Sequence, residues 1–245
     1  MSKGVSMSDN TATAGTADRL ASKLGFWAAV TASLTFVLYT ICFVAILRTS
    51  PVFMWTTLAD YLAYTEAYGG PFQPLAQGAM ILFALSFVVV LNAIHARTSP
   101  EKRVLTRVAL SFGLLFAVAV SIHYFAQLSA VRLAILEGHT EGLEHFVQGN
   151  PYSMLSAINM LGWSVFLGLA SLFVAPMFSA GGVEGVVRLA LLLNGVFCLS
   201  GGIGYVFEIT WLVFVTTTLG MGGAVLVAMT ALSIWFGKGG GQGGT

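Results

Sequence analysis

The chain has 245 residues, of which 57% are hydrophobic and only 9% are charged, and its formal net charge is +1. An ordinary soluble domain carries about a quarter charged residues, so this composition excludes a water-soluble surface. It predicts an all-helical, polytopic integral membrane protein whose surroundings are the lipid bilayer. The sequence contains no clustered basic patch, which excludes a nucleic-acid partner.

Six apolar segments define the domain organisation. Residues 1–24 are polar, and we expect a disordered tail there. A bilayer core about 30 Å thick needs about 20 apolar residues in a helix. The segments that meet this requirement form a six-helix transmembrane domain over residues 25–236. Their ranges are 25–47, 75–94, 108–131, 154–178, 189–207 and 209–236, followed by a flexible Gly-rich tail at 237–245.

Lys and Arg residues near the ends of the spans predict the orientation, because they favour the cytoplasmic side. With both termini in the cytoplasm, nine of the eleven Lys and Arg residues lie inside, and only Arg48 and Arg132 lie outside. We therefore expect a multi-pass protein of the cytoplasmic membrane with its N- and C-termini inside.

Residues 51–68 connect the first two spans and contain five aromatic side chains but few charges. Aromatic residues favour the headgroup level of a membrane, and proline is common in the first turn of a helix. We expect a short helix that begins at Pro51 and lies on the outer membrane surface. A soluble lid over a cavity is the alternative.

The outer half of the third span contains the sequence SIHYFAQLSAVRL, residues 121–133. His123 and Gln127 are four residues apart and share a helix face, whereas Arg132 is nine residues from His123, about 180° around the helix. Arg132 is predicted to anchor the outer interface by snorkelling, and contact with an anion or an acidic partner is the alternative. His123 either bonds between helices, to Gln127 or Asn159, or serves as a proton-relay or ligand-binding residue below an outward cavity.

The loop after the third span contains acidic and histidine side chains. Glu141 and His145 are four residues apart, but HExxH is absent and the spacing matches no zinc pattern. A solvated acidic loop is preferred, and no cofactor is predicted. A weak divalent-metal site is the alternative, with the candidate ligands Glu137, His139, Glu141, Glu144 and His145.

The fourth span carries small residues at three- and four-residue spacing, which allow another helix to approach closely. We expect the sixth span to be this partner, and Asn150 and Pro151 to cap and start the fourth span. Helix faces of this kind also suit a helix–helix oligomer or a membrane partner. The small residues are Ser153, Ala157, Ser164, Gly168, Ser171 and Ala175.

Glu208 separates the last two spans and is interpreted as a surface acid in a tight turn; a buried acid paired with Arg132 or His123 is the alternative.

The leading hypothesis for the function is binding or transport of a small molecule or ion through an outward-facing polar cavity. An enzyme is not favoured, because P-loop and GxSxG motifs are absent. A structural or accessory subunit and a metal-dependent membrane enzyme are the alternatives. The candidate ligand-binding residues are His123, Gln127, Asn159, Trp163 and Glu208.

Overall fold

The computed structural model describes residues 7–239, and within this range the chain is all-helical, without a strand. Six helices among the described residues are long and apolar enough to cross a membrane, so the chain is a multi-pass membrane protein. They extend over Asp18–Thr49, Phe72–Ala96, Pro100–Leu136, Met154–Met177, Gly182–Val206 and Thr210–Gly237.

Several spans consist of more than one helical segment, because the backbone changes its hydrogen-bond pattern along them. The α-helices are α1 (Met7–Thr49), α2 (Leu58–Tyr68), α3 (Phe72–Ala96), α4 (Arg103–Ala126), α5 (Arg132–Leu136), α6 (Met154–Leu161), α7 (Leu167–Val174), α8 (Gly182–Val206), α9 (Thr210–Val213) and α10 (Gly222–Gly237). The 3-10 helices are η1 (Pro100–Lys102), η3 (Leu143–His145) and η5 (Ala175–Met177). The π-helices are η2 (Gln127–Val131), η4 (Gly162–Phe166) and η6 (Phe214–Met221).

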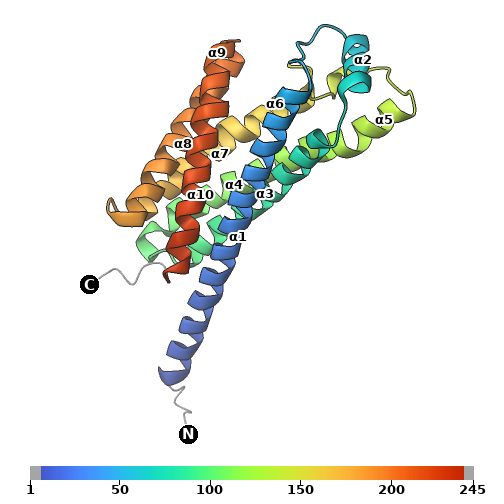
Figure 1. The fold of residues 1–245 in the computed structure, drawn as a ribbon. Coiled ribbons are helices and arrows are strands. Elements are labelled where there is room, and N and C mark those ends of the chain that lie inside the picture. The colour runs from blue at the N-terminus through green and yellow to red at the C-terminus, as the bar shows by residue number, and fades with distance from the viewer. Residues whose placement is uncertain (1–6, 240–245) are drawn as a thin grey trace.

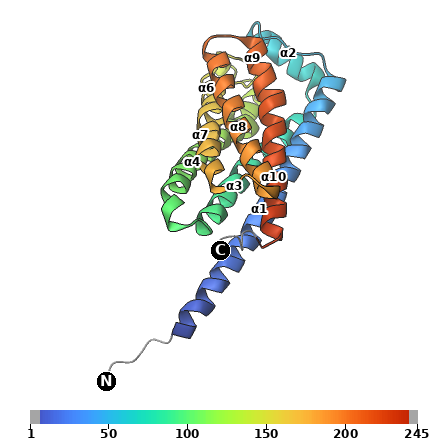
Figure 2. The same ribbon diagram turned by 90° about the vertical axis from the view of Figure 1, so that its left-hand side faces the viewer.

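The helices form one bundle in which the start of α1 and the end of α10 lie at the same end, here called the termini end (Figures 1 and 2). The α3–α4 connection also lies there, whereas α2 and α9 lie at the opposite end, here called the loop end. Helix α1 packs against α3 and α10, α4 packs against α3 and α7, and α8 packs against α7 and α10. Helices α1 and α10 cross near the termini end, and the first and last spans diverge toward the loop end (Figure 1).

The first helix is longer than the sequence predicted. Helix α1 begins at Met7, so it includes residues 7–24, which we assigned to the disordered tail. Residues 1–6 of that tail lie outside the described residues, as do residues 240–245 of the predicted C-terminal tail. Residues 18–24 are polar in part but contain no proline or glycine, so nothing in them ends the helix. The third and fifth spans likewise extend beyond their apolar cores, to Pro100–Leu136 and Gly182–Val206.

The connection after α1 is helical only in its second part. Residues 51–57 are not helical, and α2 begins at Leu58 rather than at Pro51. The reason is local capping: Thr57 Oγ1 accepts a hydrogen bond from the Asp60 backbone N–H at 3.2 Å, and both Thr56 and Thr57 hydroxyls donate to the Asp60 carboxylate at 2.7 Å. Tyr61 of α2 packs against Val131, Leu143 and Val147 at the loop end.

The fourth span begins at Met154, as its apolar range predicted, but Asn150 and Pro151 do not cap and start it. Ser153 is the N-cap of α6, because its hydroxyl accepts from the Ser156 backbone N–H at 3.0 Å. Asn150 instead organises the preceding loop: its side chain donates to the Glu144 carbonyl at 2.7 Å and accepts from the Tyr152 N–H at 2.9 Å. The Asn150–Pro151 cap was therefore wrong, since serine at position 153 competes for the same role.

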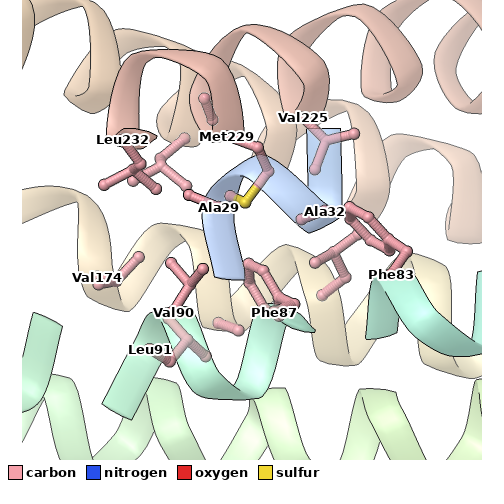
Figure 3. Packing of buried hydrophobic residues seen from close by; sticks show 14 of the residues in the cluster. Ala29, Ala32, Phe83, Phe87, Val90, Leu91, Val174, Val225, Met229 and Leu232 are labelled. Carbon is pink, nitrogen blue, oxygen red and sulfur yellow. The ribbon is translucent and has the colours of Figure 1, made fainter. Parts of the chain in front are cut away.

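A close-packed apolar core joins the spans. Figure 3 shows Met229 of α10 beside Ala29 of α1, with Phe83 and Phe87 of α3 nearby. The small side chain of Ala29 lets α1 lie close to α10, because it leaves room for Met229.

The small-residue face of the fourth span packs against α8, the fifth span, rather than against the sixth span that we expected. Gly168 of α7 and Gly195 of α8 lie in this contact. A Cβ atom at Gly168 would lie 3.0 Å from the Cys198 Cβ, and one at Gly195 would lie 2.4 Å from the Leu172 side chain. Spacing identified the packing face, but the partner depends on the order of helices around the bundle.

Candidate functional site

In the part of the chain that the structure describes, three π-helical segments lie in the half of the bundle nearer the loop end: η2 in the third span, η4 in the fourth and η6 in the sixth. Such widened turns are rare and often occur at functional sites. In η6 the hydroxyls of Thr216 and Thr217 donate to the carbonyls of Leu212 and Val213, at 2.6 and 2.7 Å. These bonds compete with the backbone N–H groups that would bond to the same carbonyls in a regular α-helix. The sequence TTT at 216–218 thus accompanies the widened backbone.

A cavity of about 270 Å³ lies between α1, α3, α4, the fourth span and η6. Its apolar lining is largely aromatic and includes Phe36, Tyr39, Phe43, Tyr124 and Trp163, so it is called the aromatic cavity below. The first and last spans diverge toward the loop end (Figure 1), and both contribute residues to the lining of this cavity.

Uncharged polar groups complete the lining: the amides Gln148 and Asn159 and the hydroxyls of Thr40, Thr217 and Thr218. No Asp, Glu, Lys, Arg or His side chain is among the lining residues within the described part of the chain. Thr40 on α1 and Thr218 on η6 are exposed, so the cavity reaches the molecular surface between these helices.

Asn159 and Trp163, both predicted as ligand-binding residues, lie together in this cavity. The Trp163 indole N–H donates to Asn159 Oδ1 at 3.1 Å, which fixes the orientation of both side chains. Because Asn159 Oδ1 accepts this bond, its amide N–H₂ group is left as a donor. The Trp163 ring packs edge-on against Phe116 at 4.9 Å and parallel to Phe83 at 5.8 Å, measured between ring centroids.

The structure places His123 beside the cavity rather than in its lining. His123 is fully buried, and its Nδ1 lies 2.9 Å from the Leu155 carbonyl oxygen of α6. A carbonyl only accepts, so Nδ1 carries the proton, and Nε2 is a buried acceptor without a partner in the described residues. The geometry matches a neutral histidine that joins two helices, with Leu155 as the partner instead of Gln127 or Asn159.

Gln127 is also buried and holds the loop that follows the third span. Its Nε2 donates to the Phe146 carbonyl at 2.6 Å, and its Oε1 accepts from the Gln148 backbone N–H at 3.1 Å. The Gln148 side chain accepts from Gln77 Nε2 of α3 at 2.8 Å and lines the cavity. Gln127 therefore acts on the cavity through Gln148.

Glu208 and Arg132 lie apart from the cavity. Glu208 is exposed in the turn between α8 and α9, where its φ of 56° lies in the left-handed region. Arg132 is exposed at the start of α5, and its Nε donates to the Leu128 carbonyl of the preceding helical turn at 3.0 Å. The turn is tight, as expected, and Glu208 is placed as a surface acid.

The loop candidates for a metal do not come together. Within residues 7–239, no three His, Cys, Asp or Glu side chains are arranged to hold a metal ion. One close pair is Glu144 and His145, neighbours in the sequence, whose Oε1 and Nε2 atoms are 3.7 Å apart; His145 is exposed and Glu144 is half-buried. Glu137, His139 and Glu141 are exposed in the same loop.

Sequence reasoning missed most of the cavity lining. Tyr39 and Tyr124 lie within apolar runs and resemble core residues, and Gln148 belongs to a polar loop. The signal that could have found the tyrosines is their position inside spans, where a hydroxyl needs a polar neighbour.

Comparisons of the chain with protein-family models, with curated proteins and with solved structures gave no match. The cavity geometry is therefore the basis on which a function is inferred.

Proposed function

We propose that this membrane protein binds a small, uncharged, amphipathic molecule in the cavity between α1, the fourth span and η6. The observation that carries the proposal is the lining: aromatic faces with amide and hydroxyl groups, and no ionisable carboxylate or cation. An ion taken out of water into such surroundings would lack a countercharge, which costs several kcal/mol. A neutral molecule can instead stack on the aromatic rings and bond to Asn159 or Gln148.

The size of the cavity supports a small ligand. Small-molecule sites in proteins are typically about 300–1,000 Å³, and this cavity, at about 270 Å³, lies just below that range. A compact ring system with one hydrogen-bonding group suits the volume and the single fixed Asn159–Trp163 pair. The exposed Thr40 and Thr218 mark the side from which the molecule enters, between the diverging first and last spans.

Binding is better supported than passage through the bundle. Phe83, Phe87 and Phe116 are fully buried and pack against one another beside the cavity, with ring centroids 5.8–6.3 Å apart. Transport would require this aromatic cluster to rearrange. We also infer that the loop end faces outward, because most Lys and Arg residues flank the spans at the termini end. The cavity is then accessible from the outer half of the membrane.

Fluorine NMR on detergent-solubilised protein tests the proposal with three neutral probes, fluoroindole, fluorophenol and fluorobenzamide. We expect saturable binding of at least one probe and none of fluoroindole carboxylate, which carries a charge. Asn159→Leu and Trp163→Ala should weaken binding at least about tenfold, because each removes a hydrogen bond or an aromatic wall.

Matched controls exist on the same bundle. Asn92 of α3 is exposed and donates only to the Val88 carbonyl of its own helix, and Trp211 is exposed outside the cavity. Asn92→Leu and Trp211→Ala should leave binding unchanged. The proposal fails if no neutral probe binds, or if the control variants weaken binding as much as the cavity variants do.

A further inference from the structure

A second cavity, of about 510 Å³, lies at the termini end. Charged side chains line it, whereas the lining of the aromatic cavity contains none. It is formed where the spans end or begin at this end of the bundle: α1 contributes Asp18, the α3–η1 connection Arg97, α8 Glu184 and α10 Trp235. Lys102 of η1 adds a second cation. Since these positions lie at the ends of membrane-spanning helices, the cavity is at the level of the lipid headgroups.

Arg97 is held in place on three sides. Its Nη1 donates to Ser22 Oγ of α1 at 2.9 Å, its Nη2 donates to the Gly239 carbonyl, and its guanidinium carbon lies 4.9 Å from the centre of the Trp235 ring. Burial lowers the pKa of Arg97 from its usual range, and the nearby Asp18 carboxylate opposes this shift. A guanidinium has five N–H donors, so donors remain for a ligand after these two bonds.

Glu184 is fixed just as firmly. Its Oε1 accepts from the Trp235 indole N–H at 3.0 Å, and its Oε2 accepts from the Ser179 backbone N–H at 2.9 Å. Each carboxylate oxygen has two lone pairs, so each retains an acceptor position. Lys102 Nζ donates to the Pro176 carbonyl at 2.9 Å and has two further donors. The cavity thus presents pre-oriented positive and negative groups around one indole ring.

The balance of charge identifies the ligand class. Two cations, Arg97 and Lys102, and two carboxylates, Asp18 and Glu184, line the cavity. A purely anionic ligand would meet two repelling carboxylates, whereas a ligand with both a phosphate and an ammonium group satisfies both signs. Ile94 and Phe178 give the same cavity an apolar wall that an acyl chain can follow.

We propose that this cavity is a binding site for the zwitterionic headgroup of a phospholipid that carries a primary ammonium group, such as phosphatidylethanolamine. Arg97 and Lys102 bind the phosphate, Glu184 and Asp18 bind the ammonium, and Trp235 forms the floor between them. The site lies at the opposite end of the bundle from the aromatic cavity and does not depend on the function proposed for that cavity.

Native mass spectrometry of the full chain tests the site with phosphatidylethanolamine, phosphatidylglycerol and phosphatidylcholine of identical acyl chains. We expect the wild type to retain phosphatidylethanolamine about tenfold better than either other lipid. Arg97→Gln should reduce that retention about tenfold, since it removes a charge-assisted contact. Glu184→Gln keeps a group of the same shape and should abolish the preference over phosphatidylglycerol.

Arg188→Gln is the matched control, because Arg188 is an exposed cation in the first turns of α8 that does not line the cavity. It should leave lipid retention unchanged. If Arg97→Gln does not fold, the exposed Lys102 provides a second variant, Lys102→Gln, with the same expected direction. Equal retention of the three lipids, or equal loss in Arg188→Gln, would overturn the proposal.

Soluble phosphoethanolamine separates the two sources of this headgroup chemistry. If it competes with bound phosphatidylethanolamine in the wild type and not in Arg97→Gln, the headgroup is what the site recognises, as proposed. If it binds in an Arg97-dependent manner while no lipid is retained, the ligand is a free phosphate ester and the lipid proposal is wrong.

Discussion

Gln127 and Gln148 are joined by a hydrogen bond of 3.1 Å from the Gln148 backbone N–H to the Gln127 side-chain oxygen. This bond connects a buried position in the third span to the loop residue that lines the aromatic cavity. Gln127→Leu should leave this N–H and the Phe146 carbonyl without their partner, which costs about 1–3 kcal/mol.

The expected results are faster hydrogen exchange in residues 143–150 and several-fold weaker binding of the neutral probe that the wild type binds. Arg132→Ala is the control, because Arg132 is exposed and bonds within its own helix. Unchanged exchange in the loop of Gln127→Leu would show that Gln127 does not position Gln148.

His123 has a different expected role, although it was predicted beside Gln127 on the same helix face. Its ring bonds to the Leu155 carbonyl and does not line the cavity. His123→Leu should therefore lower the free energy of unfolding by about 0.5–1.5 kcal/mol and leave probe binding within about twofold. Thermal unfolding and fluorine NMR measure the two effects. Loss of binding without loss of stability would assign His123 to the ligand site instead.

The sequence was sufficient for the parts of the fold that depend on hydrophobicity. Six apolar runs became six helices, because a helix satisfies its own backbone within a membrane. Local capping was predicted less accurately: α2 begins after Thr57 rather than at Pro51, and Ser153 rather than Asn150 caps the fourth span. Asn159 and Trp163 were found in the cavity because a polar side chain inside a span is conspicuous. The aromatic walls and the Arg97–Trp235 contact require the order of helices around the bundle, which periodicity does not contain.

The contact between α7 and α8 predicts an effect of added methyl groups. A Cβ at Gly168 would meet the Cys198 Cβ at 3.0 Å and the Gly195 carbonyl oxygen at 3.3 Å, and neither can move without shifting a backbone. Gly168→Ala should destabilise the bundle by about 1–3 kcal/mol. Gly78→Ala is the matched control, since nothing lies within 4 Å of its added Cβ. It should be neutral or stabilising, as alanine favours a helix over glycine.

Unfolding in a denaturing detergent series compares the two glycine variants with the wild type. Similar stability of Gly168→Ala and Gly78→Ala would show that the two spans can separate at no cost.

Asp60 predicts a pH dependence at the start of α2. Hydrogen bonds from Thr56 and Thr57 hold the pKa of its carboxyl below the ordinary value of 3.8. A lowered folded-state pKa stabilises the folded form above the unfolded pKa, and this stabilisation is lost as the pH falls through the lower folded value. Hydrogen exchange of residues 58–62 should therefore increase in this acid range. Asp60→Asn should remove the pH dependence; an unchanged pH profile in this variant would contradict the assignment.

The orientation of the bundle predicts which single cysteines react from outside the cell. The natural Cys42 and Cys198 are both buried, so they give little background labelling. His139 is exposed in the loop after α5, and Glu101 is exposed in η1 at the opposite end. His139→Cys should react with a membrane-impermeant maleimide in intact cells, whereas Glu101→Cys should react only after permeabilisation, because Lys and Arg concentrate at its end. The reverse labelling pattern would mean that the orientation is inverted. The aromatic cavity would then lie in the inner half of the membrane, and the cavity that contains Arg97 would lie at the outer surface.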